Sequence, residues 1–213
     1  MTESADRLKQ LILESGITLE SGIARQLLDY LSLLEKWNPT VNLTSTTDWS
    51  GIGPLFHEAI WASAFYPDNA ASHLDIGSGS GFPAIPLRIL RPQIHMEMVE
   101  SRTRRSVFLE TVASSLGMTD TRIHNMRLNT FLQRGDGGKA WDCVSWKALK
   151  LGSDDLGILR ERAHQQTQFW MFHGKELAVE EPAIFERSFK LIRSERFKSV
   201  KQWFLSIYRP LIG

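Results

Sequence analysis

The sequence predicts an α/β fold in which a doubly wound, mostly parallel seven-stranded sheet carries a helical N-terminal cap. From about residue 73 onward, short apolar segments alternate with helical segments, which is typical of right-handed βαβ units and a parallel sheet. A run of glycine and serine follows the first apolar segment and opens a helix, as in sheets that bind a ligand at their carboxyl edge. The residues before this region show helical periodicity only.

The N-terminal third contains three segments in which apolar residues recur at helical spacing. These segments cover residues 8–16, 19–37 and 55–65. Gly16 ends the first, the Asn38-Pro39 pair ends the second, and Pro67 follows the third. We therefore expect residues 1–67 to form a helical cap that packs on a core comprising residues 68–213.

The remaining chain supplies the sheet and the helices that cover it. The expected strands are residues 73–76, 94–99, 121–124, 142–146, 169–172, 189–192 and 203–208. The expected helices are residues 84–90, 104–116 and 156–165. Only about ten residues, without a helical pattern, separate the last two strands. Because parallel strands need a longer crossover, we expect the last strand to be antiparallel.

Composition narrows the class of protein. Of 213 residues 42% are hydrophobic, which is enough for a sizeable buried core, and the net charge of +1 neither demands nor excludes an anionic partner. Cys143 is the single cysteine, which rules out an internal disulfide and suits a reducing compartment. The histidines show no metal-ligand spacing, and neither a signal peptide nor an apolar span is evident. We expect a cytoplasmic protein without a metal or a membrane segment.

The strongest local signal is a turn of small residues between the first strand of the sheet and a helix. Its sequence is Asp75-Ile76-Gly77-Ser78-Gly79-Ser80-Gly81-Phe82. Glycines let a backbone adopt positive φ and approach a ligand closely. In the dinucleotide fingerprint G-x-G-x-x-G the third glycine would occupy the position of Phe82, so the spacing does not fit a dinucleotide. The P-loop pattern G-x-x-x-x-G-K-[ST] is absent from the sequence.

Two acids indicate which ligand the turn holds. Asp75, at the end of the first strand, would repel a pyrophosphate and would suit an ammonium group. Glu100 ends the second strand, where an acid can accept hydrogen bonds from two ribose hydroxyls. S-adenosylmethionine has an ammonium, a sulfonium and a ribose but no phosphate. The two acids together therefore indicate S-adenosylmethionine.

Further motifs surround this site. They are Leu34-Glu35-Lys36-Trp37-Asn38, Asn42-Leu43-Thr44-Ser45, Pro83-Ala84-Ile85-Pro86-Leu87, Arg91-Pro92, Arg104-Arg105, Arg127 and Trp141-Asp142. With the glycine turn they give residues 33–147 a resemblance to the bacterial small-subunit (16S) ribosomal RNA guanine-N7 methyltransferases, also called the glucose-inhibited division protein B family. The glycine turn followed by Pro-x-Ile-Pro-Leu is specific to this family among methyltransferases, and so is Trp-Asn…Asn-Leu-Thr-Ser.

The resemblance implies a Rossmann-like class I methyltransferase that transfers a methyl group to N7 of a guanine in 16S ribosomal RNA, with the small ribosomal subunit as partner and a monomeric state. The expected cofactor contacts are Asp75, Gly77, Ser78, Gly79, Gly81, Phe82, Glu100, Ser101, Leu128, Asn129 and Lys147. Candidates for positioning the reacting groups are Asn42, Arg127, Lys147 and His173. Candidates for contacts to RNA phosphates are Arg102, Arg104, Arg105, Arg127 and Lys150.

The chain departs from the family pattern mainly in the substrate half. His57 is followed by Glu58-Ala59-Ile60-Trp61, where the family usually has His-x-x-Asp-Ser. Lys147 stands where the family usually has the arginine of Ser-Arg-Ala, and His173 stands where it has the lysine of Lys-Gly. Asn129 replaces a usual acid. The cofactor half of the pattern is kept.

The expected chemistry needs no general base. Guanine N7 has a free lone pair, so the enzyme must chiefly align N7 with the methyl group and exclude water. Two alternatives remain at this point. One is a methyltransferase of the same fold that acts on another RNA or a small molecule, and the other is a module that binds the cofactor or RNA but has lost catalysis. A dehydrogenase is disfavoured by Asp75 and Phe82.

Overall fold

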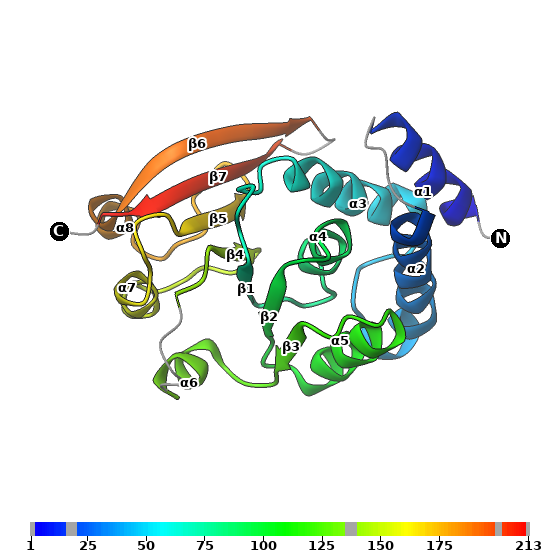
Figure 1. Cartoon of the computed structure of the whole chain (residues 1–213), viewed down its shortest axis with the longest axis horizontal. Coiled ribbons are helices and arrows are strands. Elements are labelled where there is room, and N and C mark those ends of the chain that lie inside the picture. The colour runs from blue at the N-terminus through cyan, green and yellow to red at the C-terminus, as the bar shows by residue number, and fades with distance from the viewer. Residues whose placement is uncertain (1–2, 16–20, 135–139, 199–201, 212–213) are drawn as a thin grey trace.

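A computed structural model describes residues 3–15, 21–134, 140–198 and 202–211. Its centre is a seven-stranded sheet in the order β3-β2-β1-β4-β5-β7-β6 (Figure 1). The strands are β1 Ser72–Ile76, β2 His95–Val99, β3 Thr121–His124, β4 Cys143–Lys147, β5 Gln168–His173, β6 Phe189–Lys198 and β7 Gln202–Pro210. Strands β1 to β5 pair in parallel, and β7 is antiparallel to both β5 and β6. The predicted seven strands and the antiparallel last strand are confirmed.

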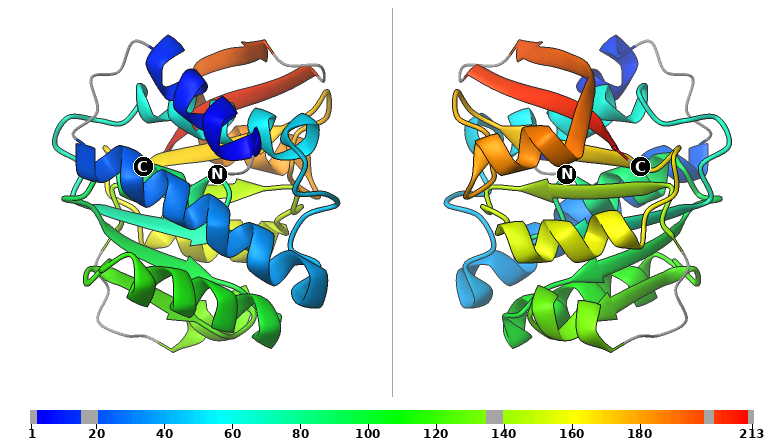
Figure 2. Two further views of the ribbon diagram at one scale, coloured as in Figure 1. Left: turned by 90° about the vertical axis from the view of Figure 1, so that its right-hand side faces the viewer. Right: turned by 90° about the vertical axis from the view of Figure 1, so that its left-hand side faces the viewer.

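Helices cover both faces of the sheet. They are α1 Glu3–Glu14, α2 Ser21–Val41, α3 Trp49–Ser63, α4 Ala84–Leu90, α5 Thr103–Ser115, α6 Leu128–Gln133, α7 Ser153–Glu161 and α8 Pro182–Ser188. Figure 2 shows α1, α2 and α5 in front of the sheet in one view and α7 and α8 in front of it in the opposite view. Because both faces are covered, the central strands are buried almost throughout rather than on alternate residues, as in β5, where five of the six residues are buried.

Two large apolar clusters fill the two faces. One joins the N-terminal helices to α4, α5 and β2, with Leu8, Leu34 and Met98 all fully buried. The other joins β1, β4 and β5 to α6, α7 and α8, with Trp146 and Phe169 at its centre. The first cluster contains residues from α1, α2 and α3 together with residues of the sheet, so the N-terminal helices and the sheet share one core.

Several helix boundaries differ from the sequence prediction: α7 spans Ser153–Glu161 instead of 156–165, α1 begins at Glu3, and two further differences lie at prolines. Helix α2 continues past Pro39 to Val41, and the backbone N–H of Asn42 donates to the carbonyl of Asn38 at 2.9 Å to close its last turn. Helix α3 begins at Trp49, well before the predicted start, and contains Pro54. A proline removes one helical hydrogen bond, and in α3 the packing of fully buried residues on either side of it offsets that loss.

Two short helices, α6 and α8, were not predicted, because each is too short to show helical periodicity. Strand β6 extends beyond the predicted residues 189–192 to Lys198. The predicted helix end at Gly16 and the first two residues of the predicted helix 19–37 lie outside the described residues. Within the described ranges, no helix combines the length and the apolar character needed to cross a membrane.

Candidate functional site

The glycine turn connects β1 to α4, and hydrogen bonds hold it against the end of β2. Gly77 donates to the carbonyl of the last β2 residue at 2.8 Å, and the N–H of Gly79 donates to Oε2 of Glu100 at 2.8 Å. Gly77 and Gly79 have φ of +70° and +58°, where glycine is favoured. At Gly81 a Cβ would lie 2.6 Å from Cγ1 of Ile85. The turn therefore needs its glycines and presents bare backbone.

The Glu100 carboxylate is fixed by backbone donors. It is only 5% exposed; Oε2 accepts from Gly79, and Oε1 accepts from the N–H of Arg102 at 2.8 Å. A carboxylate offers about four acceptor positions. Each Glu100 oxygen therefore has one further lone pair available for a ligand in the space beside the turn.

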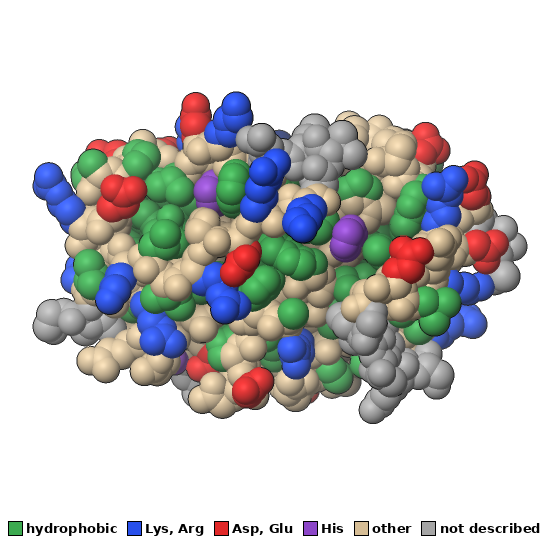
Figure 3. All heavy atoms as spheres, turned by 90° about the horizontal axis from the view of Figure 1, so that it is seen from above, with side chains coloured by type: hydrophobic (Ala, Val, Ile, Leu, Met, Phe, Trp, Pro, Cys, Tyr) green, Lys and Arg blue, Asp and Glu red, His purple; other side chains and the backbone are tan. Residues whose placement is uncertain are grey.

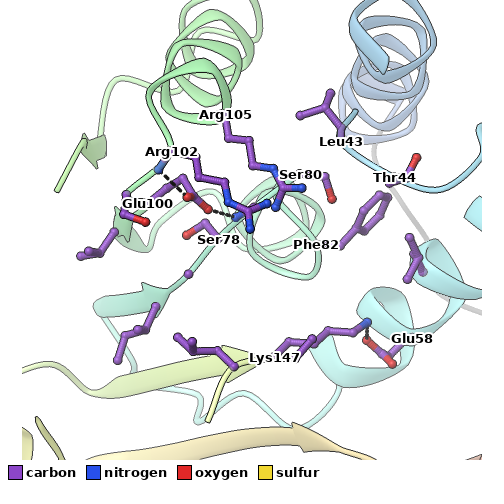
Figure 4. A pocket seen from close by; sticks show the side chains of 18 of the residues that line it. Leu43, Thr44, Glu58, Ser78, Ser80, Phe82, Glu100, Arg102, Arg105 and Lys147 are labelled. Carbon is purple, nitrogen blue, oxygen red and sulfur yellow. Dashed lines mark hydrogen bonds and ion pairs between the residues drawn. The ribbon is translucent and has the colours of Figure 1, made fainter. Parts of the chain in front are cut away.

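A pocket of about 940 Å³ opens at the carboxyl ends of β1, β2 and β4, within the size range of small-molecule sites. The glycine turn, Glu100 and the residues after β3 line one part of it. Helix α3, the end of β4 and the β6–β7 strands line the other part. Figure 4 shows these two parts: Glu100 and Arg102 lie on one side, and Lys147 extends to Glu58 on the other.

The segment that follows α2 forms the rim of the pocket. Leu43, Thr44 and Ser45 line the cavity. Their conformation is set by Asn38, whose Oδ1 accepts from the N–H of Thr44 at 2.8 Å. Asn42 has φ of +56°, and its carbonyl accepts from the Arg105 guanidinium at 3.2 Å. The Trp-Asn…Asn-Leu-Thr-Ser motif thus acts mainly through backbone geometry.

Lys147 and Glu58 form an ion pair inside the pocket. Lys147 is the last residue of β4 and Glu58 lies on α3. Their side chains are 14% and 5% exposed, respectively. The Lys147 ammonium also lies 5.6 Å from the ring centroid of Trp203 on β7. Phe197, opposite Trp203 in the β6–β7 ladder, packs edge-on against the ring of His57. Two of the residues that depart from the family pattern, Glu58 and Lys147, therefore contact each other in this part of the pocket.

Asp75 lies under the glycine turn and outside the pocket lining. It is 2% exposed and accepts a hydrogen bond from the Ser145 hydroxyl. Burial raises the pKa of Asp75 to about 6, although the hydrogen bonds from Ser145 and Ser78 act in the opposite direction. Its carboxylate is therefore close to its titration point near neutral pH.

The structure gathers most of the predicted site residues around this one pocket. The predicted residues that line it are Gly77, Ser78, Gly79, Phe82, Glu100, Ser101, Arg102, Arg105, Arg127, Leu128, Lys147 and Lys150. The predicted residues outside its lining are Asn42, Asp75, Gly81, Arg104, Asn129 and His173.

Local contacts explain two of the residues outside. Asn129 lies in the first turn of α6, where its Oδ1 accepts from the N–H of Thr130 at 2.7 Å. His173 is 7% exposed, its ring nitrogens lie 2.9 Å from the carbonyl of Gly174 and 2.9 Å from the hydroxyl of Ser206, and burial lowers its pKa. The structure therefore places His173 at the end of β5, outside the pocket lining.

Several lining residues were not among the predicted site residues. Three of them form the part of the pocket away from Glu100, namely Glu58 on α3, Phe197 on β6 and Trp203 on β7. For Glu58, the signal was the departure from the family pattern beside His57. For Phe197 and Trp203, no sequence signal distinguished them from ordinary strand residues. Among the described residues, no cluster of three or more His, Cys, Asp and Glu is placed to hold a metal ion.

Comparison with known proteins agrees with this arrangement. A family model described as rRNA small subunit methyltransferase G matches residues 23–202 of the chain. The chain belongs to this family. The resemblance found in the sequence is thereby confirmed.

Curated members of the family align over part of their length. The ribosomal RNA small subunit methyltransferase G of Listeria welshimeri is 34% identical over 147 residues, which is 68% of this chain and 61% of that protein. The protein of the same name from Bacillus pumilus is 36% identical over 138 residues, which is 64% of this chain and 58% of that protein. The chain thus spans about three fifths of the length of these relatives.

Solved structures share the fold. The glycopeptide N-methyltransferase MtfA complexed with S-adenosyl-L-methionine has a TM-score of 0.57 at 12% identity and covers 73% of this chain and 93% of its own. The ribosomal protein L11 methylase from Lactobacillus delbrueckii subsp. bulgaricus has a TM-score of 0.51 at 15% identity, with 73% and 78% covered. These likenesses concern the fold alone and confirm the predicted Rossmann-like α/β class.

Proposed function

We propose that this chain is an S-adenosylmethionine-dependent methyltransferase that modifies N7 of a guanine in 16S ribosomal RNA. One observation carries the proposal in a chain that belongs to this family. The glycine backbone of residues 77–81 lies beside the carboxylate of Glu100, which accepts hydrogen bonds from two backbone N–H groups. A ribosomal RNA substrate places the proposed activity in the cytoplasm. The predicted monomeric state stays a prediction.

The residues fit S-adenosylmethionine. The remaining lone pairs of Glu100 suit the two ribose hydroxyls. Met126 and Leu128 give the lining next to Glu100 an apolar surface for the flat adenine. At Gly77 a Cβ would lie 3.1 Å from Cδ2 of Leu149, so a side chain there would compete with the lining. Asp75, just under the turn, provides the negative charge that an ammonium group favours.

S-adenosylmethionine supplies an electrophilic methyl group on a sulfonium. The lone pair of guanine N7 would accept this methyl group and sulfur would keep the electron pair of the broken C–S bond, so the chain would need no residue to take up a proton. The chain must hold the guanine in line with the methyl group, and good alignment of this kind contributes roughly 7–11 kcal/mol. The rim residues 43–46 and the glycine turn line the same pocket, so both reactants would bind in one cavity.

Phosphate contacts are expected at the rim of the pocket. Arg102, Arg105, Arg127 and Lys150 line it and are at least partly exposed. On the face seen in Figure 3, basic and acidic side chains are interspersed among apolar ones. The basic residues that line the pocket favour RNA contacts at its rim, with an affinity that falls as salt rises.

The first experiment is a calorimetric titration with S-adenosylmethionine, followed by transfer of labelled methyl groups to small ribosomal subunits that lack the modification. We expect binding, and label on guanine N7 of the 16S RNA. Gly79→Arg should abolish binding, because it places a long side chain where the turn lines the pocket.

Gly117→Arg is the matched control, because Gly117 also has positive φ but has nothing within 4 Å of its Cβ position and lies outside the pocket lining. It should bind S-adenosylmethionine like the wild type. Failure of the wild-type protein to bind the cofactor would refute the proposal. Binding with transfer to another substrate only would refute its RNA part.

A further inference from the structure

The ion pair of Lys147 and Glu58 is unusual because it is buried. The two side chains are 14% and 5% exposed, and both line the pocket on the side away from Glu100. Removing two charges from water costs several kcal/mol per ion, and an apolar pair of the same volume is often at least as stable. A buried pair that borders a ligand cavity therefore points to ligand recognition rather than to stability.

Both members of the ion pair have hydrogen-bonding positions that the pair itself does not use. Glu58 accepts from Lys147 through Oε1, and no hydrogen bond to its Oε2 is formed within the described part of the chain. The Lys147 ammonium has three donors, of which this contact uses one. The half-buried indole of Trp203 lies beside the ammonium, 5.6 Å from it to the ring centroid. Two acceptors, free donors and a flat aromatic ring thus meet in one corner of the pocket.

This set of groups complements one nucleobase edge. The Watson–Crick edge of guanine presents two neighbouring donors, N1–H and the 2-amino group, next to one acceptor, O6. RNA-binding proteins commonly read exposed bases by hydrogen bonds to this edge and by stacking on aromatic rings. We propose that the Glu58 carboxylate accepts from N1–H and the 2-amino group of the acceptor guanine, that Lys147 donates to O6, and that Trp203 provides the stacking surface. This inference rests on the proposed function and names the residues that select its base.

The same edge excludes other bases. Adenine presents a lone pair at N1, which the Glu58 carboxylate would repel. Uracil lacks a second donor next to its N–H, and cytosine presents a lone pair at N3. A site built from charged hydrogen-bonding groups discriminates strongly, because a wrong ligand leaves those groups unpaired.

Recognition through this edge also assists the reaction. N7 lies on the far side of the purine from N1–H and the 2-amino group, so a guanine held by Glu58 keeps N7 free for attack. As N7 forms its bond to the methyl group, positive charge develops on the purine and its N–H groups become stronger donors. A carboxylate bound to them therefore stabilises the transition state more than the ground state. Loss of this contact should lower kcat as well as raise KM.

The test uses the 2-amino group as a probe. The methylated guanosine is first located by cleavage of the RNA chain at the N7-methylated position. Two RNAs are then prepared, one with guanosine and one with inosine at that position. Inosine differs from guanosine only in lacking the 2-amino group. For the wild-type protein we expect kcat/KM to be about 10- to 100-fold lower with inosine, as for loss of a hydrogen bond to a charged group. For Glu58→Gln we expect slow transfer and a ratio between the two RNAs near one.

Two further variants keep the test sharp. Glu161→Gln removes an exposed acid at the C-terminal end of α7, outside the pocket lining, and should retain the wild-type ratio. Glu58→Asp keeps a negative charge opposite Lys147, so this variant should still fold. Because its side chain is shorter, it should also reduce the ratio of kcat/KM between guanosine and inosine RNA. Cofactor affinity and circular dichroism should be unchanged in all folded variants.

The possible results separate the two proposals. A wild-type ratio near one, or a wild-type ratio retained in both Glu58→Gln and Glu58→Asp, would overturn the base-reading role while transfer itself is still observed. Absence of any transfer to guanosine by the wild-type protein would instead overturn the proposed function.

Discussion

Buried Asp75 and His73 belong to one chain of hydrogen-bonded side chains in the core. The Tyr66 hydroxyl contacts Nδ1 of His73, Nε2 of His73 lies 2.7 Å from the Ser145 hydroxyl, and that hydroxyl donates to Asp75. This order of donors assigns the neutral tautomer with its proton on Nε2. Burial lowers the pKa of His73 to about 3 and raises the pKa of Asp75 to about 6.

The two groups have opposite effects on stability. Between pH 3.8 and about 6 the folded state keeps the proton of Asp75 and the unfolded state loses it, so the free energy of unfolding falls as pH rises. Between about pH 3 and 6.5 the unfolded state binds a proton at His73 and the folded state does not, so the free energy of unfolding rises with pH. In the wild-type protein the two contributions largely cancel.

Asp75→Asn should therefore stabilise the protein at neutral pH. Asparagine can still accept a hydrogen bond from Ser145 but has no charge to bury. The raised pKa of Asp75 corresponds to a destabilisation of the folded state by about 3 kcal/mol at pH 7, which the substitution would remove. The difference from wild type should vanish near pH 4 and grow towards pH 7. Urea unfolding at several pH values measures it, with the exposed Asp68→Asn as control. A variant less stable than wild type at pH 7 would contradict the argument.

The same substitution should weaken binding of S-adenosylmethionine, because it removes the negative charge under the glycine turn. A buried carboxylate that destabilises the fold and improves ligand binding is typical of functional sites, where stability and activity trade off. Calorimetric titration of Asp75→Asn measures this effect separately from the unfolding experiment.

At the scale of elements, Tyr30 links cap helix α2 to the glycine turn. Its hydroxyl donates to the carbonyl of Ser80 at 2.7 Å, and its fully buried ring packs against Phe56 and Phe82. Tyr30→Phe keeps the ring but leaves the carbonyl without its donor, which should cost about 1–3 kcal/mol of stability. It should also weaken cofactor binding several-fold, because the turn loses a contact that holds its backbone.

Tyr208→Phe is the matched control for this element. Tyr208 is also buried, but it lies on β7 and outside the pocket lining. Chemical unfolding and calorimetry of both variants measure the two effects. If both variants bind S-adenosylmethionine with wild-type affinity, the hydrogen bond from α2 does not position the turn.

Elements with a strong local signal could be predicted from sequence, and elements determined by tertiary packing could not. Helix α4 has its predicted bounds, because a glycine turn precedes it and Arg91-Pro92 follows it. The start of α3 was misplaced because Pro54 suggests a boundary, whereas the buried Ile52 and Phe56 hold the helix together around it.

The site divides in the same way. The cofactor side follows from the glycine turn and the acid at the end of the next strand, which are close in sequence and obey the rule for open α/β sheets. On the acceptor side Lys147 was predicted, but Glu58 and Trp203 were not, because α3, β4 and β7 meet only through the topology of the sheet. No local pattern in the sequence shows that these three elements are neighbours.

At the scale of the whole molecule, the cap and the sheet should unfold together, because Leu34 of α2 is fully buried in the cluster that also contains Met98 of β2. Leu34→Ala should lower the free energy of unfolding by about 2–5 kcal/mol, as other core leucine truncations do. Tryptophan fluorescence and far-UV circular dichroism should report one coincident transition, because the described residues of the cap helices belong to the same apolar cluster as the sheet. Leu13→Ala, at an 80% exposed position of α1, is the control and should change stability by less than about 0.5 kcal/mol. Two separated transitions in Leu34→Ala would show instead that residues 1–67 unfold independently of the sheet.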